Sequence, residues 1–339
     1  MSRLDLTSMR RFQVIIAVMV LSSLSVDAQD NYAVDSTQYL IFYNDPWINL
    51  HHFLYQKAKG TQEAHLQEDG NELMDIGEDS IWKSLTPSEL VSLTLAVNHY
   101  QQEIVEKSLF DLVDIRLALQ RQVGSQISDT IRDVNYTRTM NDAFSVYRDR
   151  FWPVHNAHNT LVLAKHIALV RALEPTLMTR METFAGLEWP EQALLRVDLT
   201  AYANYAGAYT VARPVANTVI STLDPEALGT AMLETIFHEP SHLLYSRNSA
   251  FRSRIYHHSQ ELEMEFPRGL WHAVQFYLCG RLVQNELSGL GVEHKLTMDE
   301  RAVFTEYNTP QFRTVLERYY KGETDIETTV TNLLMALKE

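Results

Sequence analysis

The sequence predicts a mainly α-helical protein with a small antiparallel sheet, which is an α+β fold. Apolar residues at helical spacing and helix-start signals recur along most of the 339 residues. β-branched and tyrosine-rich runs are confined to residues 194–222, with turns expected at Gly207 and Pro214. These runs are typical of two or three short strands, and they immediately precede a helical segment at residues 231–245.

Residues 1–28 have the features of an export signal. Three arginines precede an uncharged apolar run at residues 14–26, and small residues stand before a cleavage point at Ala28. The run is too short for a membrane-spanning helix. An uncleaved membrane anchor is the alternative. We therefore expect a secreted or periplasmic protein without stable membrane insertion after signal cleavage.

The composition disfavours several kinds of partner and covalent bond. The formal net charge of −14 disfavours nucleic acid and anionic membrane surfaces. The single cysteine, Cys279, excludes an intramolecular disulfide. The length allows one large domain or two intimate ones. We expect a helical N-terminal region at residues 29–190 and a metal-site region with C-terminal helices at residues 191–339; the oligomeric state is left open.

The first region contains two clear helical segments. A capping box at residues 86–89 starts a helix that is expected to run to about Leu119. Residues 141–184 form one long helical stretch interrupted at Pro153. A polar face of this stretch either lines a cleft or is solvated. His155, beside the proline, is its first candidate for chemistry.

The segment at residues 231–245, AMLETIFHEPSHLLY, contains the pattern H-E-x-x-H. Its histidines are His238 and His242, which lie one turn apart on the same face of a helix. Two imidazoles placed in this way can bind one zinc ion, and Glu239 is then positioned as a base for the zinc-bound water.

A proline lies inside this pattern. Pro240 removes a helix hydrogen bond and is avoided in the usual motif. Either the helix bends at the site, or the match is accidental and the two histidines are structural residues of a core helix. The helix start is expected at Asp224, as an N-cap followed by Pro225 at the first helical position.

The order of short strands followed by an H-E-x-x-H helix resembles the zincin-like metallopeptidases over residues 194–285. The resemblance implies an active-site helix packed on the sheet, a zinc ion, and an edge strand that binds an extended peptide or protein substrate. Four segments also resemble a group of exported bacterial metallopeptidase-like proteins: Trp152-Pro153-x-His155, residues 202–209, the H-E-x-x-H pattern and Leu270-Trp271-His272.

A zincin needs a third protein ligand, usually from a later element. His272 lies on an apolar helix that is expected to be buried, where an imidazole needs a partner such as a metal. Glu265, Glu263 and Glu261 are the alternatives. Each candidate also has a structural explanation. His272 then makes a hydrogen bond in the core, and the three glutamates form a solvated acidic turn.

The chemistry of such a site is well defined. Zinc held by neutral imidazoles lowers the pKa of its water to near 7, and Glu239 takes the proton. A second donor stabilises the oxyanion, and Tyr209, Tyr205 and His155 are its candidates. We expect an exported zinc-dependent hydrolase, a metallopeptidase. A non-catalytic protein with a degenerate zincin-like fold and a metal-binding role are the alternatives.

Overall fold

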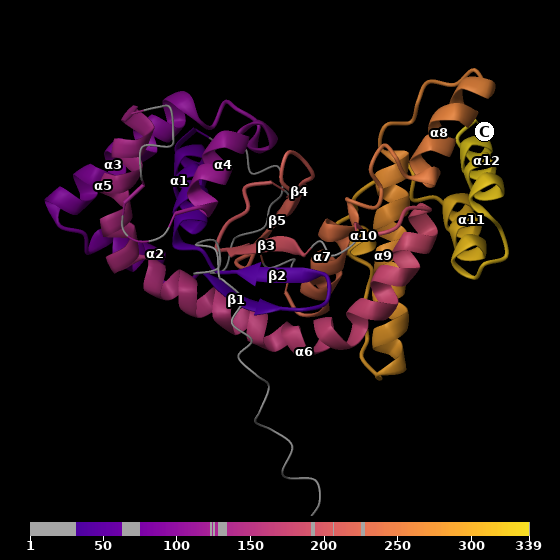
Figure 1. The fold of residues 1–339 in the computed structure, drawn as a ribbon, viewed down its shortest axis with the longest axis horizontal. Coiled ribbons are helices and arrows are strands. Elements are labelled where there is room, and N and C mark those ends of the chain that lie inside the picture. Colours follow the sequence, from indigo (N-terminus) through magenta and orange to yellow (C-terminus); the bar gives the residue numbers. More distant parts are fainter. Residues whose placement is uncertain are drawn as a thin grey trace, which may run out of the picture.

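The computed structural model describes most of the chain, namely residues 32–62, 75–122, 124, 126–127, 134–190, 194–205, 207–224 and 228–338. The expected export signal at residues 1–28 lies outside these ranges. Helices dominate the described residues (Figure 1). They are α1 (Pro46–Gln62), α2 (Glu78–Lys83), α3 (Pro87–Glu103), η2 (Leu109–Asp111), α4 (Val113–Gln120), α5 (Val134–Arg150), α6 (Trp152–Ala185), α7 (Thr230–Ser241), α8 (Ala250–Glu261), α9 (Leu270–Gly289), α10 (Thr297–Glu300), α11 (Pro310–Tyr320) and α12 (Ile326–Ala336).

The helix starts in the first region follow the sequence signals. The hydroxyl of Thr86 accepts from the Glu89 N–H, and the Glu89 carboxylate accepts from the Thr86 N–H, so the predicted capping box is confirmed. Helix α3 ends at Glu103 instead of continuing to Leu119, and α4 carries the later apolar residues. Pro153 falls in the first turn of α6, where a missing N–H costs no hydrogen bond.

The sheet is mixed, with strand order β1-β2-β3-β5-β4. Strands β2 and β3 are parallel, as are β3 and β5, whereas the β1–β2 and β4–β5 pairs are antiparallel. Strand β4 therefore lies at an edge of the sheet. The strands are β1 (Ala33–Ser36), β2 (Leu40–Tyr43), β3 (Leu195–Thr200), β4 (Ala208–Val211) and β5 (Asn217–Ser221).

The predicted α+β class is confirmed, but the prediction of an antiparallel sheet is wrong. The antiparallel β1–β2 and β4–β5 pairs are each joined by a short connection, which is the kind of pairing that sequence can reveal. Strand β3 has two parallel partners, β5 and β2, and Leu40 of β2 is in register with Leu195 far along the chain. A four-residue apolar run such as LIFY is also too short to be distinguished from a buried helix start.

The two faces of the sheet pack in different hydrophobic cores. Ile220 and Val219, neighbours on β5, point to opposite faces because side chains alternate along a strand. Ile220 belongs to the C-terminal core, formed with most of α6 and with α7, α8, α9, α11 and α12. Val219 belongs to the N-terminal core, formed with α1, α3, α4 and α5. The expected boundary at residue 190 stays a prediction. The sheet pairs β1 and β2, which precede this residue, with strands that follow it, and α6 packs against helices of the second region.

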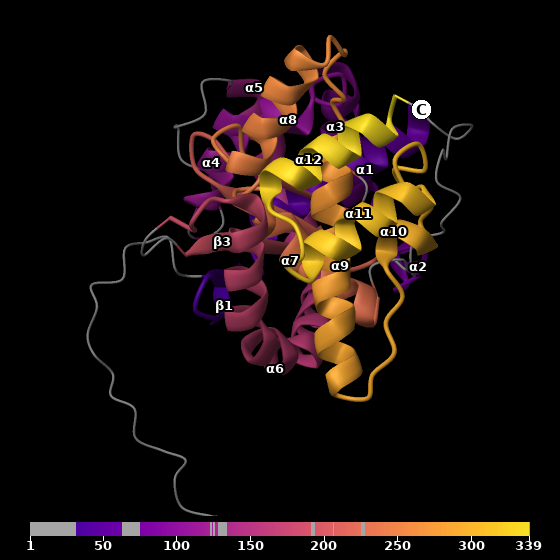
Figure 2. The same ribbon diagram turned by 90° about the vertical axis from the view of Figure 1, so that its right-hand side faces the viewer.

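Helix α6 runs beneath both groups of helices, along the lower side of the molecule in Figure 1. Helices α8, α9, α11 and α12 gather on the side that faces the viewer in Figure 2. Within the described part of the chain, each helix is too short or too polar to cross a membrane.

Candidate metal centre

Helix α7 carries the H-E-x-x-H pattern and is buried along almost its whole length between the sheet, α6 and α9. It begins at Thr230, after Gly229, whose φ of 60° suits glycine. The predicted start at Asp224 is wrong, because α7 begins at Thr230 and residues 228 and 229 before it lie outside the helix. The Asp224 carboxylate forms an ion pair with Arg301. Residues 225–227 lie outside the described residues.

Helix α7 ends inside the pattern, at Ser241, one residue after Pro240. Because proline has no N–H, the Ile236 carbonyl loses its usual donor. The last turn is tighter than an α-helical turn, because the His242 N–H donates to the Glu239 carbonyl, three residues back, at 3.1 Å. His242 keeps right-handed angles, with φ −54° and ψ −27°. The second histidine therefore stays beside the first, on a tightened last turn.

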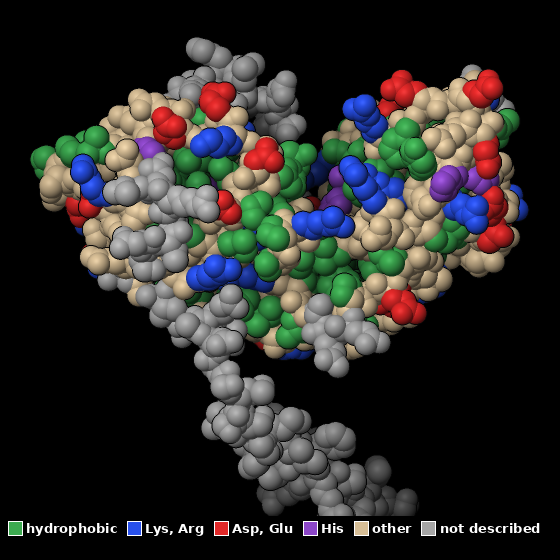
Figure 3. Space-filling model, turned by 45° about the horizontal axis from the view of Figure 1, so that its top comes forward, with side chains coloured by type: hydrophobic (Ala, Val, Ile, Leu, Met, Phe, Trp, Pro, Cys, Tyr) green, Lys and Arg blue, Asp and Glu red, His purple; other side chains and the backbone are tan. Residues whose placement is uncertain are grey.

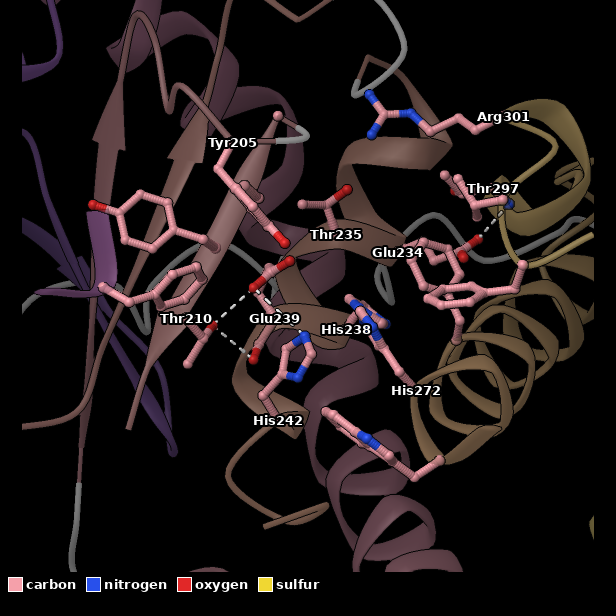
Figure 4. Close-up of a pocket in the computed structure, with 18 of the residues that line it drawn as sticks. Tyr205, Thr210, Glu234, Thr235, His238, Glu239, His242, His272, Thr297 and Arg301 are labelled. Atoms are coloured by element: carbon pink, nitrogen blue, oxygen red, sulfur yellow. Dashed lines mark hydrogen bonds and ion pairs between the residues drawn. The ribbon is translucent and has the colours of Figure 1, made fainter. Parts of the chain in front are cut away.

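Three imidazoles meet at the end of this helix (Figure 4). His238 and His242 come from the end of α7, and His272 comes from the first turn of α9. Their ligand atoms all lie within 4.8 Å of one another, and the Nε2 atoms of His238 and His272 are 3.3 Å apart. Zinc with tetrahedral Zn–N bonds of about 2.0–2.1 Å separates its ligand nitrogens by about 3.4 Å. The separation of His238 and His272 is therefore close to that between two ligands of one zinc ion.

The surroundings keep the three imidazoles neutral. Burial holds the pKa values of His238 and His242 well below the usual range, and each is lowered further by neighbouring histidines. Burial also lowers the pKa of His272 to about 4. A metal binds the neutral form of imidazole, so these ligands need not lose a proton at neutral pH before binding.

Glu239 is buried beside the imidazoles. Its carboxylate accepts from the Thr210 hydroxyl at 2.9 Å, and its Oε2 atom is 3.9 Å from Nε2 of His242. Burial raises the pKa of Glu239 to about 7, although the Thr210 hydrogen bond opposes this effect. A bound cation would lower this pKa again. Thr210 lies on the edge strand β4, so the sheet orients the carboxylate.

A pocket of about 720 Å³ opens over these groups. Figure 3 shows the hollow between the two lobes of the molecule, with histidine side chains on its wall. Strand β4 forms one wall, and the first turns of α9 with the segment after α10 form the other. Much of the lining is aromatic or apolar: Phe110, Tyr205, Tyr209, Trp271, Phe276, Val303 and Phe304.

Two of the predicted catalytic residues direct their polar atoms elsewhere. The hydroxyl of Tyr209 contacts Nε2 of His52 at 3.2 Å, in the N-terminal core. His155 is fully buried between Tyr147 and Glu78, at 2.8 Å and 2.6 Å, and is not among the described residues that line the pocket. Tyr205, the third candidate, projects into the pocket (Figure 4).

The candidate third ligands differ in their distance from the H-E-x-x-H pair. His272 contacts His238, whereas Glu261, Glu263 and Glu265 are exposed residues around the end of α8. None of these glutamates is among the described residues of the pocket wall. The structure therefore brings a histidine to the H-E-x-x-H pair.

Several residues of the site carried no usable sequence signal. In the sequence Thr210 resembles any strand threonine, and only the folded structure places it against Glu239. Phe276 lies one turn after His272 and packs its ring 4.2 Å from that of His238. Phe304, whose φ of 55° is uncommon for a residue other than glycine, packs its ring 4.8 Å from that of His272. Its position depends on a loop conformation that no short motif encodes.

We compared the chain with known proteins in three ways. A scan of protein-family models, a search of curated proteins and a search of solved structures found no match.

Proposed function

We propose that the protein is an exported zinc-dependent hydrolase, and that it is a metallopeptidase. The observation that carries this proposal is the convergence of three neutral imidazoles beside a buried carboxylate, Glu239, at an open pocket. Histidines with a purely structural role do not need to converge on one point beside a carboxylate. Three protein ligands with a free position are typical of catalytic zinc sites.

In the proposed site, His238, His242 and His272 bind the ion through one nitrogen each. Bound there, zinc would lower the pKa of a water to near 7 and polarise a substrate carbonyl. A fourth position would be left for a water or a substrate oxygen from the pocket. Trp271, Phe276 and Phe304 pack against the imidazoles and cover part of their surface.

Glu239 acts as the general base in this proposal. It takes a proton from the attacking water and later passes it to the leaving amine. Burial, which raises the pKa of the metal-free carboxyl to about 7, makes this group a better proton acceptor than an exposed glutamate, and a bound cation would oppose that effect. Thr210 holds the carboxylate by a hydrogen bond from the rigid sheet.

Tyr205 is our proposed oxyanion donor, in preference to Tyr209 and His155. It stands on the loop before β4 and packs edge-on against Phe110, with ring centroids 5.3 Å apart. In Figure 4 its hydroxyl points toward the side of the pocket that holds Glu239. The side chain is 55% exposed and is therefore accessible to a substrate.

The edge strand supports a peptide as the substrate. The Ser221 N–H donates to the Gly207 carbonyl, and in an antiparallel ladder hydrogen-bonded and non-bonded pairs alternate. The N–H and C=O of Thr210 therefore point away from β5, toward the free edge. An extended peptide can pair with these groups while the aromatic walls accept a large apolar side chain. We propose peptides with such a residue next to the scissile bond.

Metal analysis tests this proposal. The purified mature protein should contain about one zinc per chain and should hydrolyse aromatic-containing peptides in a chelator-sensitive manner. Absence of zinc after purification and after reconstitution would favour the non-catalytic alternative. Several zinc ions per chain would favour a metal-storage role.

A further inference from the structure

The end of α7 leaves one carbonyl with an unusual set of partners. In a continuous helix the His238 carbonyl would accept from the N–H of residue 242. Here the His242 N–H donates to the Glu239 carbonyl instead. The His238 carbonyl accepts from two side chains, the Ser241 hydroxyl at 2.6 Å and the Gln275 amide at 3.0 Å. This carbonyl lies in the last turn of α7, which ends at Ser241, one residue after Pro240, so the regular ladder stops at this point.

Gln275 is fully buried on α9, one turn after His272. Its amide nitrogen also donates to the Ser241 hydroxyl at 2.8 Å. A carbonyl is only an acceptor, so the nitrogen of this amide must face it. Gln275 uses its two N–H groups in this triangle, and Ser241 donates once and accepts once, whereas the side-chain oxygen of Gln275 is buried without a partner among the described residues.

We propose that Gln275 is a positioning residue that supplies the donor which the His238 carbonyl lacks at the end of α7 and thereby aligns His272 with the pair on α7. Gln275 and His272 share one helix, and the acceptor of Gln275 is the backbone of His238. The hydrogen bond therefore fixes the register of α9 against α7 at the point where the three imidazoles meet. This inference rests on the proposed zinc site.

Zinc affinity in a double-mutant cycle tests the inference. Gln275→Leu should weaken zinc binding by roughly 10- to 100-fold, the range for residues that support a ligand. Gln275→Glu, which keeps the shape but loses the donor, should behave like Gln275→Leu. With Pro240→Ala the His242 N–H can return to the His238 carbonyl, so adding Gln275→Leu should change zinc affinity by less than about threefold.

Gln284→Leu is the matched control. Gln284 lies on the same helix and also donates to a backbone carbonyl, that of His294, at 2.7 Å. Its replacement should leave zinc affinity unchanged. The inference is overturned if Gln275→Leu binds zinc like the parent, or if its effect is equally large beside Pro240 and beside the alanine.

Hydrogen exchange of the metal-free protein separates this inference from the proposed function. If the parent binds no zinc, the proposed function fails, but Gln275 can still be tested. Gln275→Leu should then speed amide exchange at residues 241–245 and leave exchange in β3 unchanged. Unchanged exchange at residues 241–245 would overturn the positioning role, and faster exchange throughout the protein would show that Gln275 serves only global stability.

Discussion

The Nε2 atoms of His238 and His272 lie 3.3 Å apart, although 34 positions separate these residues in the chain. Two uncharged imidazoles at this distance can share one proton or one metal ion. A metal would also join α7 to α9, so its binding should stabilise the folded protein.

His272→Ala should therefore weaken zinc binding by more than about 100-fold, since even residues that only support a ligand change affinity by roughly 10- to 100-fold. Glu265→Ala is the control and should bind zinc like the parent, because Glu265 is exposed outside the pocket. Competition with a chromogenic chelator measures both affinities. Loss of zinc in Glu265→Ala with retention in His272→Ala would reassign the third ligand.

Glu239→Gln should fold and bind zinc nearly as well as the parent, because the amide keeps the size of the side chain and its contact with Thr210. It removes the proposed base, so kcat should fall by roughly 10²- to 10⁴-fold. Steady-state hydrolysis of a fluorogenic peptide by metal-loaded protein is the measurement. Equal activity of parent and variant would contradict the mechanism.

Tyr205→Phe should lower kcat by roughly 10²-fold with little change in KM, as expected for a donor used mainly in the transition state. Tyr209→Phe should leave kcat within a few-fold and should instead lower thermal stability, because it breaks the contact with His52. Measuring kcat, KM and Tm for both variants distinguishes the two tyrosines. The opposite pattern would return the donor role to Tyr209.

Acid stability should depend on Glu78. Burial opposes ionisation of Glu78, but the hydrogen bond from His155 and the charge of Lys57 lower its pKa from 4.5 to about 2. This stabilisation is present above pH 4.5 and is lost as the pH falls toward 2. It amounts to about 3 kcal/mol.

Glu78→Gln should therefore be less stable than the parent at pH 7, and its unfolding free energy should fall less steeply between pH 5 and pH 2. Urea unfolding across this range measures the slope. The exposed Glu106→Gln variant should follow the parent, and parallel slopes for parent and Glu78→Gln would refute the role of this carboxylate.

The exported form should begin near Gln29. N-terminal sequencing of protein from the medium or the periplasm tests this expectation, because signal cleavage leaves a defined new terminus. A protein that starts at Met1 and is recovered with membranes would identify an uncleaved anchor.

The meeting of His238, His242 and His272 could be predicted from local patterns, whereas their role as zinc ligands stays a proposal. The i, i+4 spacing of His238 and His242 needs only the geometry of one turn. His272 stood out as an imidazole on an apolar helix, where burial requires a partner. The capping box at Thr86 and the break near Pro153 are likewise determined by neighbouring residues.

Features that depend on distant segments could not be predicted. The parallel pairing of β2 with β3 involves no local turn that could be recognised in the sequence. The direction of the Tyr209 hydroxyl depends on His52, which approaches from α1, and the position of Thr210 depends on where α7 crosses the sheet. The effect of Pro240 could not be predicted because the end of α7 is held by a group on another helix, the Gln275 amide that donates to the His238 carbonyl.

The pocket is walled by parts of both cores. His238 and His272 lie on helices of the C-terminal core, whereas Tyr209 on β4 packs in the N-terminal core. Regions that pack separately can open at different free energies. A form in which the N-terminal core has opened would still present three imidazoles but would lack the wall that receives a peptide. If the proposed function holds, such a form would bind zinc without cleaving a peptide, so zinc loading would not depend on the wall that receives the peptide.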